Sequence, residues 1–373
     1  MDTQKTDELI NFVKCQERLL KHLLLAFTIV MMFALTGCKN YTVDKIEHTF
    51  PSLVDNPLGD SSTRVVHILL PPDYDDPDNA TKRYPSVYVL HGFGASPQSI
   101  DRISKIVEGT LESWFTGWRI KDMIVVIPHA GTSLCDLRLA CGSFYRNSEG
   151  TGNYKGYILD DLIDFIDSHY RTEPDRAKRG ISGFSMGGYG SVMLAMESNV
   201  ESNSRGLFSS VASHSGLLSL EHFLDELANP SDFTMDWVNN RVLPALTAAF
   251  SPGLDLELEY NDETGEITKN DSVWALWLEN DPLTFLKGHT NGVNPFTETA
   301  VYIDCGVDDE LGLKDHVEAF VQELNNLAIE HQSDIYEYDT GSEIFDEIVN
   351  GHLLIEFRIG ESLKFHSKNF YAD

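Results

Sequence analysis

Short apolar runs alternate with amphipathic stretches along most of this chain. Residues 86–90 and 123–127 are mainly apolar, as expected of central strands that are buried on both faces of a sheet. Residues 157–170 instead carry apolar side chains at positions 158, 159, 162, 163 and 166, which is the spacing of one helix face. The alternation predicts an α/β fold whose mostly parallel central sheet is covered by helices on both faces.

The same pattern predicts further elements and one long interruption. We expect strands at residues 64–71, 177–182, 209–213, 300–305 and 334–338, and helices at residues 101–115, 189–198, 314–330 and 353–366. Residues 38–62 are polar and rich in turn formers, which favours a tether before a folded domain at residues 63–371. Residues 217–295 are too long for a simple connection, and we interpret them as a helical insertion over the rim of a functional site. A peripheral helical decoration is the alternative.

The N-terminal segment has the pattern of an export signal. Basic side chains between positions 14 and 21 precede an apolar run at residues 23–35, which is too short to span a bilayer comfortably. The run leads into a threonine, a glycine and then Cys38, which resembles the lipobox of bacterial lipoproteins. We therefore expect residues 1–37 to be a signal peptide and Cys38 to carry a lipid that anchors the chain in the bacterial cell envelope. An ordinary signal peptide or a short anchor helix is the alternative.

Composition restricts the partners and the cysteine chemistry. The chain carries a formal net charge of −30, which repels nucleic acid and anionic lipid headgroups. We expect no nucleic-acid partner and no membrane contact beyond the lipid anchor. Cys135 and Cys141 lie six positions apart in a predicted loop, and in an exported protein they could form a local disulfide. Cys305 lies in an apolar strand and is expected to be a buried thiol, and no C-x-x-C or H-E-x-x-H motif indicates a metal.

Residues 183–188 contain the strongest candidate for a nucleophile. Ser185 is framed by Gly183, Gly187 and Gly188 between a predicted strand and a predicted helix, which is the context of a nucleophile elbow. The glycines leave room for a tight turn, and the following helix directs free N–H groups towards the serine. A plain glycine-rich connection is the alternative, because this stretch lacks the signatures of phosphate loops.

A serine nucleophile needs a base and an acid, which follow it in the order Ser, acid, His in strand-and-helix hydrolases. Asp309 follows the predicted strand at residues 300–305 and is the candidate acid, with Asp308 as the competing carboxylate. Both would otherwise only cap the next helix. His352 opens the last predicted helix directly after a glycine and is the candidate base.

The oxyanion that forms during acyl transfer needs fixed N–H donors. One candidate is the backbone N–H of Met186, which follows the nucleophile. The other is the backbone N–H of Phe93, in the glycine-rich loop after the predicted strand at residues 86–90. The residues that we expect to contact the substrate are His91, Tyr145, His214 and Trp237.

Together, His91-Gly92, residues 183–188, residues 306–309 and Gly351-His352 resemble the esterase D-type branch of the α/β-hydrolases. That branch includes S-formylglutathione hydrolases, feruloyl and acetylxylan esterases, and mycolyltransferases. Residues 144–172 are also similar to its bacterial feruloyl and acetyl esterase members. The resemblance covers roughly residues 60–370. It implies an α/β-hydrolase fold, the catalytic and oxyanion residues named above, and no cofactor.

These residues predict a cell-envelope serine carboxylesterase. Its substrate would be an acetyl, feruloyl or short-chain acyl ester, either as a small molecule or linked to polysaccharide. The alternatives are an acyltransferase with a sugar or lipid hydroxyl as acceptor, an S-formylglutathione-type thioesterase, a peptidase of the same superfamily, and a non-catalytic surface binding module. The lipoprotein-like leader and the insertion depart from the formylglutathione hydrolases.

Overall fold

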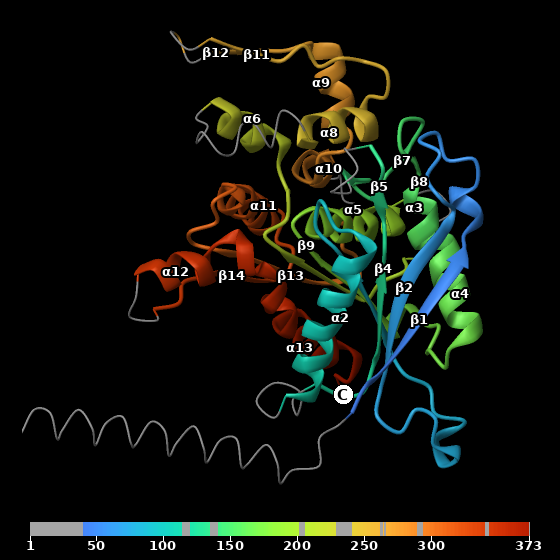
Figure 1. The fold of residues 1–373 in the computed structure, drawn as a ribbon. Coiled ribbons are helices and arrows are strands. Elements are labelled where there is room, and N and C mark those ends of the chain that lie inside the picture. Colours follow the sequence, from blue (N-terminus) through green and yellow to red (C-terminus); the bar gives the residue numbers. More distant parts are fainter. Residues whose placement is uncertain are drawn as a thin grey trace, which may run out of the picture.

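An eight-stranded sheet runs through the part of the chain that the structure describes, in the order β1-β2-β4-β3-β9-β10-β13-β14 (Figure 1). The computed structural model describes residues 40–113, 120–134, 141–200, 206–228, 241–261, 264, 266–288, 294–339 and 343–372. The strands are β1 (Thr42–Thr49), β2 (Thr63–Leu70), β3 (Ser86–Leu90), β4 (Ile124–Pro128), β9 (Arg179–Phe184), β10 (Ser210–His214), β13 (Ala300–Gly306) and β14 (Gln332–Tyr336). β1, β2 and β4 pair antiparallel, and every pairing from β4 to β14 is parallel. The predicted mostly parallel sheet is confirmed.

Helices cover both faces of this sheet. α2 (Pro97–Glu112) and α13 (Ile359–Phe370) lie on one face, and α4 (Ile163–His169), α5 (Met186–Val200) and α11 (Leu313–Asn326) lie on the other. Successive side chains of β3 point to opposite faces, as the pleat of a strand requires. Val87 and Val89 pack with α2 and α13, whereas Tyr88 and Leu90 pack on the side of α4 and α5. All four are fully buried, which explains the unbroken apolar run in the sequence.

The remaining elements outside the insertion are short. They are η1 (Pro51–Leu53), η2 (Pro77–Asn79), β5 (Gly131–Thr132), β6 (Cys141–Gly142), β7 (Asn147–Ser148), β8 (Gly152–Asn153), α3 (Tyr154–Gly156), the π-helix η4 (Tyr157–Leu162), η5 (Arg176–Lys178), α12 (Glu343–Asn350) and η7 (His352–Arg358). None of the helices in the described ranges is long and apolar enough to cross a bilayer. Within the same ranges, no three His, Cys, Asp or Glu side chains are grouped so as to hold a metal ion.

The tether expected at residues 38–62 is wrong, because the first strand of the sheet lies inside it. β1 pairs with β2 along its whole length. It is an edge strand with several exposed positions, and its aliphatic residues Val43 and Ile46 are only partly buried. Phe50 follows as a fully buried core residue. An edge strand needs few apolar side chains, so hydropathy alone does not reveal it. Cys38 lies outside the described residues.

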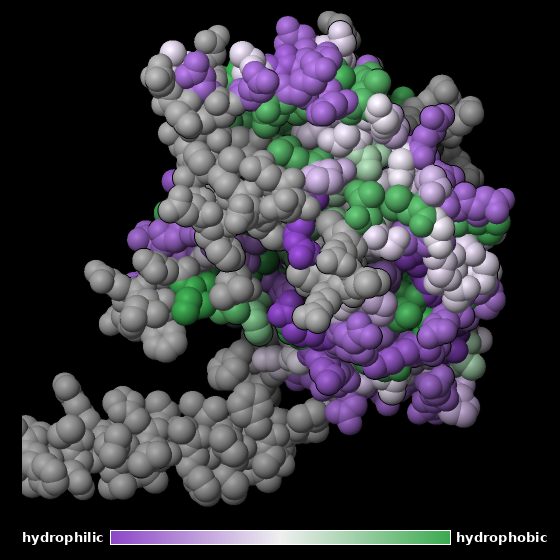
Figure 2. All heavy atoms as spheres, turned by 45° about the horizontal axis from the view of Figure 1, so that its top comes forward, coloured by the Kyte–Doolittle hydropathy of each residue, from purple (hydrophilic) through white to green (hydrophobic). Residues whose placement is uncertain are grey.

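The insertion at residues 217–295 contains helices, as expected, and one small hairpin. The sequence pattern did not predict the hairpin. Its elements are α6 (Leu220–Ala228), α8 (Leu243–Phe250), β11 (Glu259–Asn261), β12 (Glu266–Thr268), α9 (Asp271–Leu278) and α10 (Pro282–Gly288). They gather at the top of Figure 1, and α10 packs against both α5 and α11. Figure 2 turns this end forward and shows hydrophilic side chains beside apolar ones. Trp274 and Trp277 are buried in the core, where they stabilise the insertion.

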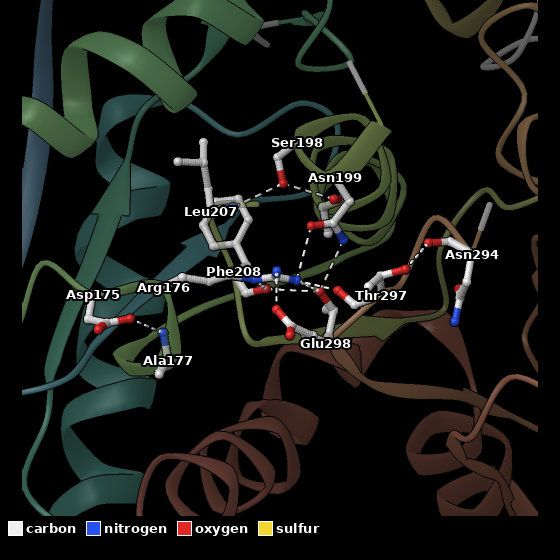
Figure 3. Close-up of polar contacts among 12 residues, drawn as sticks. Asp175, Arg176, Ala177, Ser198, Asn199, Leu207, Phe208, Asn294, Thr297 and Glu298 are labelled. Atoms are coloured by element: carbon white, nitrogen blue, oxygen red, sulfur yellow. Dashed lines mark hydrogen bonds and ion pairs between the residues drawn. The ribbon is translucent and has the colours of Figure 1, made fainter. Parts of the chain in front are cut away.

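Arg176 ties the end of the insertion to the sheet (Figure 3). Its Nη2 donates to Asn199 Oδ1 at 3.1 Å and to Thr299 Oγ1 at 2.9 Å. Its Nε donates to the Phe208 carbonyl at 3.2 Å, and its Nη2 also reaches the Thr297 carbonyl. These partners belong to the end of α5, the segment before β10 and the segment before β13. The Arg176 guanidinium therefore hydrogen-bonds three parts of the chain near the point where the insertion returns to the sheet.

Candidate active site

Ser185 lies on a sharp turn between β9 and α5. Its φ is +57°, a left-handed conformation that is unfavourable for a residue with a side chain. Glycines let the turn close. A Cβ on Gly187 would lie 2.1 Å from the Leu90 carbonyl oxygen, and a Cβ on Gly183 would lie 2.3 Å from the Gly187 carbonyl oxygen. Ser185 itself is partly exposed, so the strained backbone presents its side chain at the surface of the sheet edge.

The ends of β3 and β10 meet this turn. The Ser185 N–H donates to the His214 carbonyl at 2.9 Å. A Cβ on Gly92 would lie 3.4 Å from Ser185 Cβ, so the loop after β3 lies beside the serine. Gly92 and Phe93 in this loop are partly exposed. Met186 opens α5, so its N–H has no acceptor in a preceding helical turn. One predicted oxyanion donor, Met186, thus follows Ser185 in the chain, and the other, Phe93, belongs to a loop that lies beside it in space.

Asp309 and His352 form a hydrogen-bonded pair. His352 Nδ1 donates to Asp309 Oδ2 at 2.9 Å. The Asp309 side chain is fully buried, whereas the His352 side chain is 15% exposed, so the imidazole lies on the solvent side of the pair. The His352 N–H also donates to Glu310 Oε2 at 2.6 Å, which fixes its loop. The competing Asp308 is exposed, and its N–H donates to the Asn350 carbonyl at 3.3 Å. Of the two candidate acids, the structure pairs Asp309 with the candidate base.

Donors around Asp309 keep its carboxylate ionised. Burial alone would raise the pKa of Asp309, but the hydrogen bond and charge of His352, the nearby Ser215 hydroxyl and the Leu311 N–H outweigh it and hold the pKa below its ordinary value. The Leu311 N–H donates to Oδ1 at 3.1 Å, and the Cys305 thiol donates to Oδ2 at 3.6 Å. Burial raises the pKa of the Cys305 thiol, which therefore stays a neutral donor. A carboxylate placed this way orients an imidazole and stabilises the imidazolium that forms when it takes a proton.

His91, the first residue of the loop after β3, is held in one tautomer. Its Nε2 accepts the Ala130 N–H at 2.8 Å, so Nδ1 carries the proton and donates to the Gly92 carbonyl at 2.8 Å. Burial lowers the pKa of His91 to about 4, and the ring is neutral at physiological pH. The Tyr145 O–H donates to the His91 carbonyl at 2.8 Å. These bonds fix the backbone of the loop next to Ser185.

A second loop covers the two residues that are expected to bind the oxyanion. A Cβ on Gly142 would lie 2.0 Å from Met186 Sδ and 2.8 Å from Phe93 Cδ2. The backbone at Gly142 therefore lies directly against both side chains. The preceding Cys141 is disulfide-bonded, which restrains this loop. Its predicted partner Cys135 lies outside the described residues.

Three of the four predicted substrate-binding residues lie beneath the site, contrary to the expectation of substrate contact. His91, Tyr145 and His214 are each 0% exposed. His214 Nδ1 donates to the buried Asp304 carboxylate at 2.7 Å. The sequence pattern locates the ends of strands, but it does not show how deeply a side chain is buried. All three side chains therefore support the site from the protein interior. Trp237, the fourth residue, lies outside the described residues.

Two side chains act on Asp309 without having been predicted from the sequence to do so: Cys305 directly and Ser215 through Cys305. Cys305 is the free buried thiol that its apolar strand predicts, but its contact with the acid is new. Ser215 follows the predicted strand at residues 209–213, next to the nucleophile strand. That position is the only feature of the sequence that suggests a place near the site for Ser215. The long insertion separates Ser215 from Asp309 along the chain, so no local pattern links them.

The family described as Putative esterase matches residues 61–352 of this chain. Two Mycobacterium tuberculosis proteins, Esterase Rv1288 and Esterase MT1326, are each 28% identical to it over 159 residues. The matched segment covers 42% of this chain and 29% of each of those proteins. The chain therefore spans less than a third of the length of these curated relatives.

Several solved structures share the fold. A ferulic acid esterase superposes with a TM-score of 0.58 at 19% identity, covering 88% of this chain and 99% of that chain. FphF, a fluorophosphonate-binding serine hydrolase of Staphylococcus aureus, has a TM-score of 0.52 at 16% identity, covering 87% and 99%. Esterase B of Lactobacillus rhamnosis has a TM-score of 0.53 at 11% identity, covering 94% and 97%. At these identities the similarity is one of fold, and the α/β-hydrolase fold predicted from the sequence is confirmed.

Proposed function

Because this chain belongs to the Putative esterase family, we propose that it is a serine carboxylesterase that cleaves carboxylic esters through an acyl-enzyme on Ser185. The observation that carries the proposal is the hydrogen bond between the buried Asp309 carboxylate and His352. Ser185 and Asp309 follow the carboxyl ends of parallel strands in one sheet, β9 and β13, and such ends share one edge. A strained serine, an oriented imidazole and a buried carboxylate in this setting match the requirements of acyl transfer.

The proposed reaction uses each of these groups in turn. Ser185 Oγ attacks the ester carbonyl carbon while His352 Nε2 takes the hydroxyl proton. The backbone N–H groups of Phe93 and Met186 bind the oxygen that gains negative charge. The tetrahedral intermediate then expels the alcohol, which receives the proton from His352 and leaves an acyl group on Ser185. Water repeats the sequence, with His352 as its base, and the carboxylic acid is released.

For the substrate, we propose an acetyl, feruloyl or short-chain acyl ester on a small alcohol or on a polysaccharide. The fold shared with a ferulic acid esterase supports this class. The lipoprotein-like leader supports a lipid anchor at Cys38 and a location in the cell envelope, where extracellular polysaccharide is accessible. The net charge of −30 disfavours polyanionic esters.

Hydrolysis of p-nitrophenyl acetate tests the mechanism. We expect Ser185→Ala and His352→Ala to lose at least about 10³-fold in kcat. Ser168→Ala removes an exposed serine on α4 and should keep the wild-type rate, so it is the matched control. A fluorophosphonate probe should label the wild type and Ser168→Ala but not Ser185→Ala. Near wild-type turnover by either site variant would refute the proposal.

A panel of substrates then tests the substrate class. We expect aryl acetates and methyl ferulate to be hydrolysed faster than anionic esters of the same size. Product analysis with an added alcohol distinguishes hydrolysis from transfer, because a transferase would form the new ester in preference to the free acid. Predominant transfer would replace the esterase assignment by an acyltransferase with the same residues.

A further inference from the structure

The dipeptide His214-Ser215 at the end of β10 contacts both halves of the proposed site. The His214 carbonyl accepts the Ser185 N–H at 2.9 Å, and the Ser215 N–H donates to the Asp304 carbonyl at 2.8 Å. The Ser215 hydroxyl donates to Cys305 Sγ, and the Cys305 thiol in turn donates to the Asp309 carboxylate. A single turn of backbone therefore connects the nucleophile elbow to the strand that precedes the acid.

The backbone of Ser215 is held in an unfavourable conformation. Its φ is +43°, in the left-handed region that glycine adopts much more readily than a residue with a Cβ atom. Ser215 is also only 1% exposed, so its hydroxyl does not interact with bulk water. A glycine would suit this backbone better. The presence of serine indicates that the hydroxyl makes a contribution that offsets the strain.

The surroundings of the hydroxyl show what that contribution is. Ser215 Oγ lies 3.2 Å from Cys305 Sγ, and Cys305 Sγ lies 3.6 Å from Asp309 Oδ2. The Leu311 N–H holds the other oxygen, Oδ1, at 3.1 Å. The donors that face the carboxylate from inside the protein are therefore buried groups on fixed backbone. They leave Oδ2 directed at His352 Nδ1, 2.9 Å away.

We propose that Ser215 is a positioning residue, whose hydroxyl orients the Cys305 thiol and through it holds the Asp309 carboxylate so that Oδ2 accepts the His352 Nδ1–H. The inference rests on the proposed function, because Ser215 acts on the reaction only through Cys305, Asp309 and His352. Locking the carboxylate by a buried hydrogen bond restricts the imidazole to the tautomer and direction that can take a proton from Ser185. Ser215 itself contacts neither substrate nor reacting atoms.

Ser215→Gly tests this inference without a folding penalty, because glycine fits the left-handed backbone. We expect its midpoint of urea unfolding to be equal to or above that of the wild type, since relief of strain offsets the lost hydrogen bond. We expect kcat for p-nitrophenyl acetate to fall about 2- to 10-fold, as for loss of one neutral hydrogen bond, with little change in KM. The acid limb of the kcat/KM profile should move to higher pH, because the Asp309 carboxyl takes up a proton more readily without this donor.

Two further variants separate the hydroxyl from the backbone. Ser215→Ala removes the hydroxyl but keeps the strain, so it should lose as much kcat as Ser215→Gly and be less stable. Ala328→Gly relieves a left-handed residue with a φ of +53° on an exposed loop, and it should keep both kcat and the pH profile. Equal loss of kcat in both Ser215 variants, with no loss in Ala328→Gly, assigns the effect to the hydroxyl.

The results distinguish a failure of this inference from a failure of the proposed function. If Ser185→Ala is inactive but Ser215→Gly retains the wild-type kcat and pH profile, Ser215 has no positioning role and the esterase mechanism stands. If Ser215→Gly loses stability but folded enzyme keeps its kcat, the hydroxyl is structural and the inference is overturned. If Ser185→Ala stays active, the proposed function itself is refuted.

Discussion

Replacing Asp309 with asparagine should inactivate the enzyme without unfolding it. Asparagine has the same shape as aspartate, but it carries no charge and only one of its two terminal atoms accepts hydrogen bonds. The Leu311 N–H, 3.1 Å from Oδ1, keeps the amide oxygen at that position. The amide NH₂ then occupies the place of Oδ2, opposite His352 Nδ1. Two donors cannot face each other, so Nδ1 must lose its proton and Nε2 must carry it.

A histidine in that tautomer cannot accept a proton from Ser185. The same change in Ser-His-Asp protease triads lowers kcat about 10⁴-fold, which corresponds to about 5 kcal/mol in the activation free energy. We expect a loss of that order here. The structure also predicts a cost in stability. The depressed pKa of Asp309 stabilises the fold at every pH above its ordinary value of 3.8, a contribution that is lost as pH falls through the lower pKa of the folded state and that the neutral asparagine lacks.

Asp308→Asn is the matched control, because it makes the identical chemical change one position away on an exposed side chain. Steady-state hydrolysis of p-nitrophenyl acetate gives kcat for both variants, and urea unfolding shows whether each is folded. We expect Asp308→Asn to match the wild type within about twofold, as for a surface substitution. The reasoning fails if Asp309→Asn keeps more than about a tenth of the wild-type kcat, or if Asp308→Asn is the inactive variant.

Three other predictions follow from close contacts and buried charge. Gly187→Ala should abolish activity and lower the free energy of unfolding by at least about 2 kcal/mol, because its Cβ would lie 2.1 Å from the Leu90 carbonyl oxygen. Gly109→Ala in α2 is the control, and it should stabilise the fold because a Cβ there meets nothing within 4 Å. A Gly187→Ala variant with wild-type activity and stability would contradict the geometry of the turn at Ser185. Arg176→Leu should lower the free energy of urea unfolding by about 1–3 kcal/mol, because it removes the hydrogen bonds of the guanidinium to partly buried acceptors. A change below about 0.5 kcal/mol would refute the anchoring role. Burial lowers the pKa of His366 from its ordinary value of 6.5 to about 3. Below pH 6.5 the imidazole is therefore protonated in the unfolded chain but not in the folded one. The free energy of unfolding should fall by about 2 kcal/mol between pH 6.5 and 5. His366→Asn should remove that part of the pH dependence. If the free energy of unfolding varies with pH equally in the wild type and in His366→Asn, the contribution of His366 is ruled out.

The strongly apolar strands could be predicted from the sequence because burial on both faces leaves a clear pattern. β3 has the predicted limits, and β4 and β10 are shifted by one residue. β1 was missed because an edge strand exposed to solvent needs only a few apolar positions. The hairpin β11–β12 was missed for a similar reason, since its three-residue strands are too short for any periodicity to show.

The candidate site could be predicted as far as local sequence constrains it. The glycines around Ser185 are required by the turn, so the sequence shows them directly. The pairing of Asp309 with His352 was expected from chain order, but the choice between Asp308 and Asp309 depends on which side chain points inward, and only the fold determines this. The hydroxyl of Ser215 reaches Asp309 through strand neighbours that are distant in sequence, and no local pattern reports such a contact.

The insertion leaves the sheet after β10 and returns at β13, and these strands are hydrogen-bonded neighbours. A segment that departs and returns at adjacent strands has closely spaced ends whatever its length, and lengthening such a loop costs little free energy. Ser185, Asp309 and His352 all lie outside it. The length of this segment can therefore change without moving the proposed hydrolytic residues away from the ends of their strands, provided that α10 keeps its packing against α5 and α11.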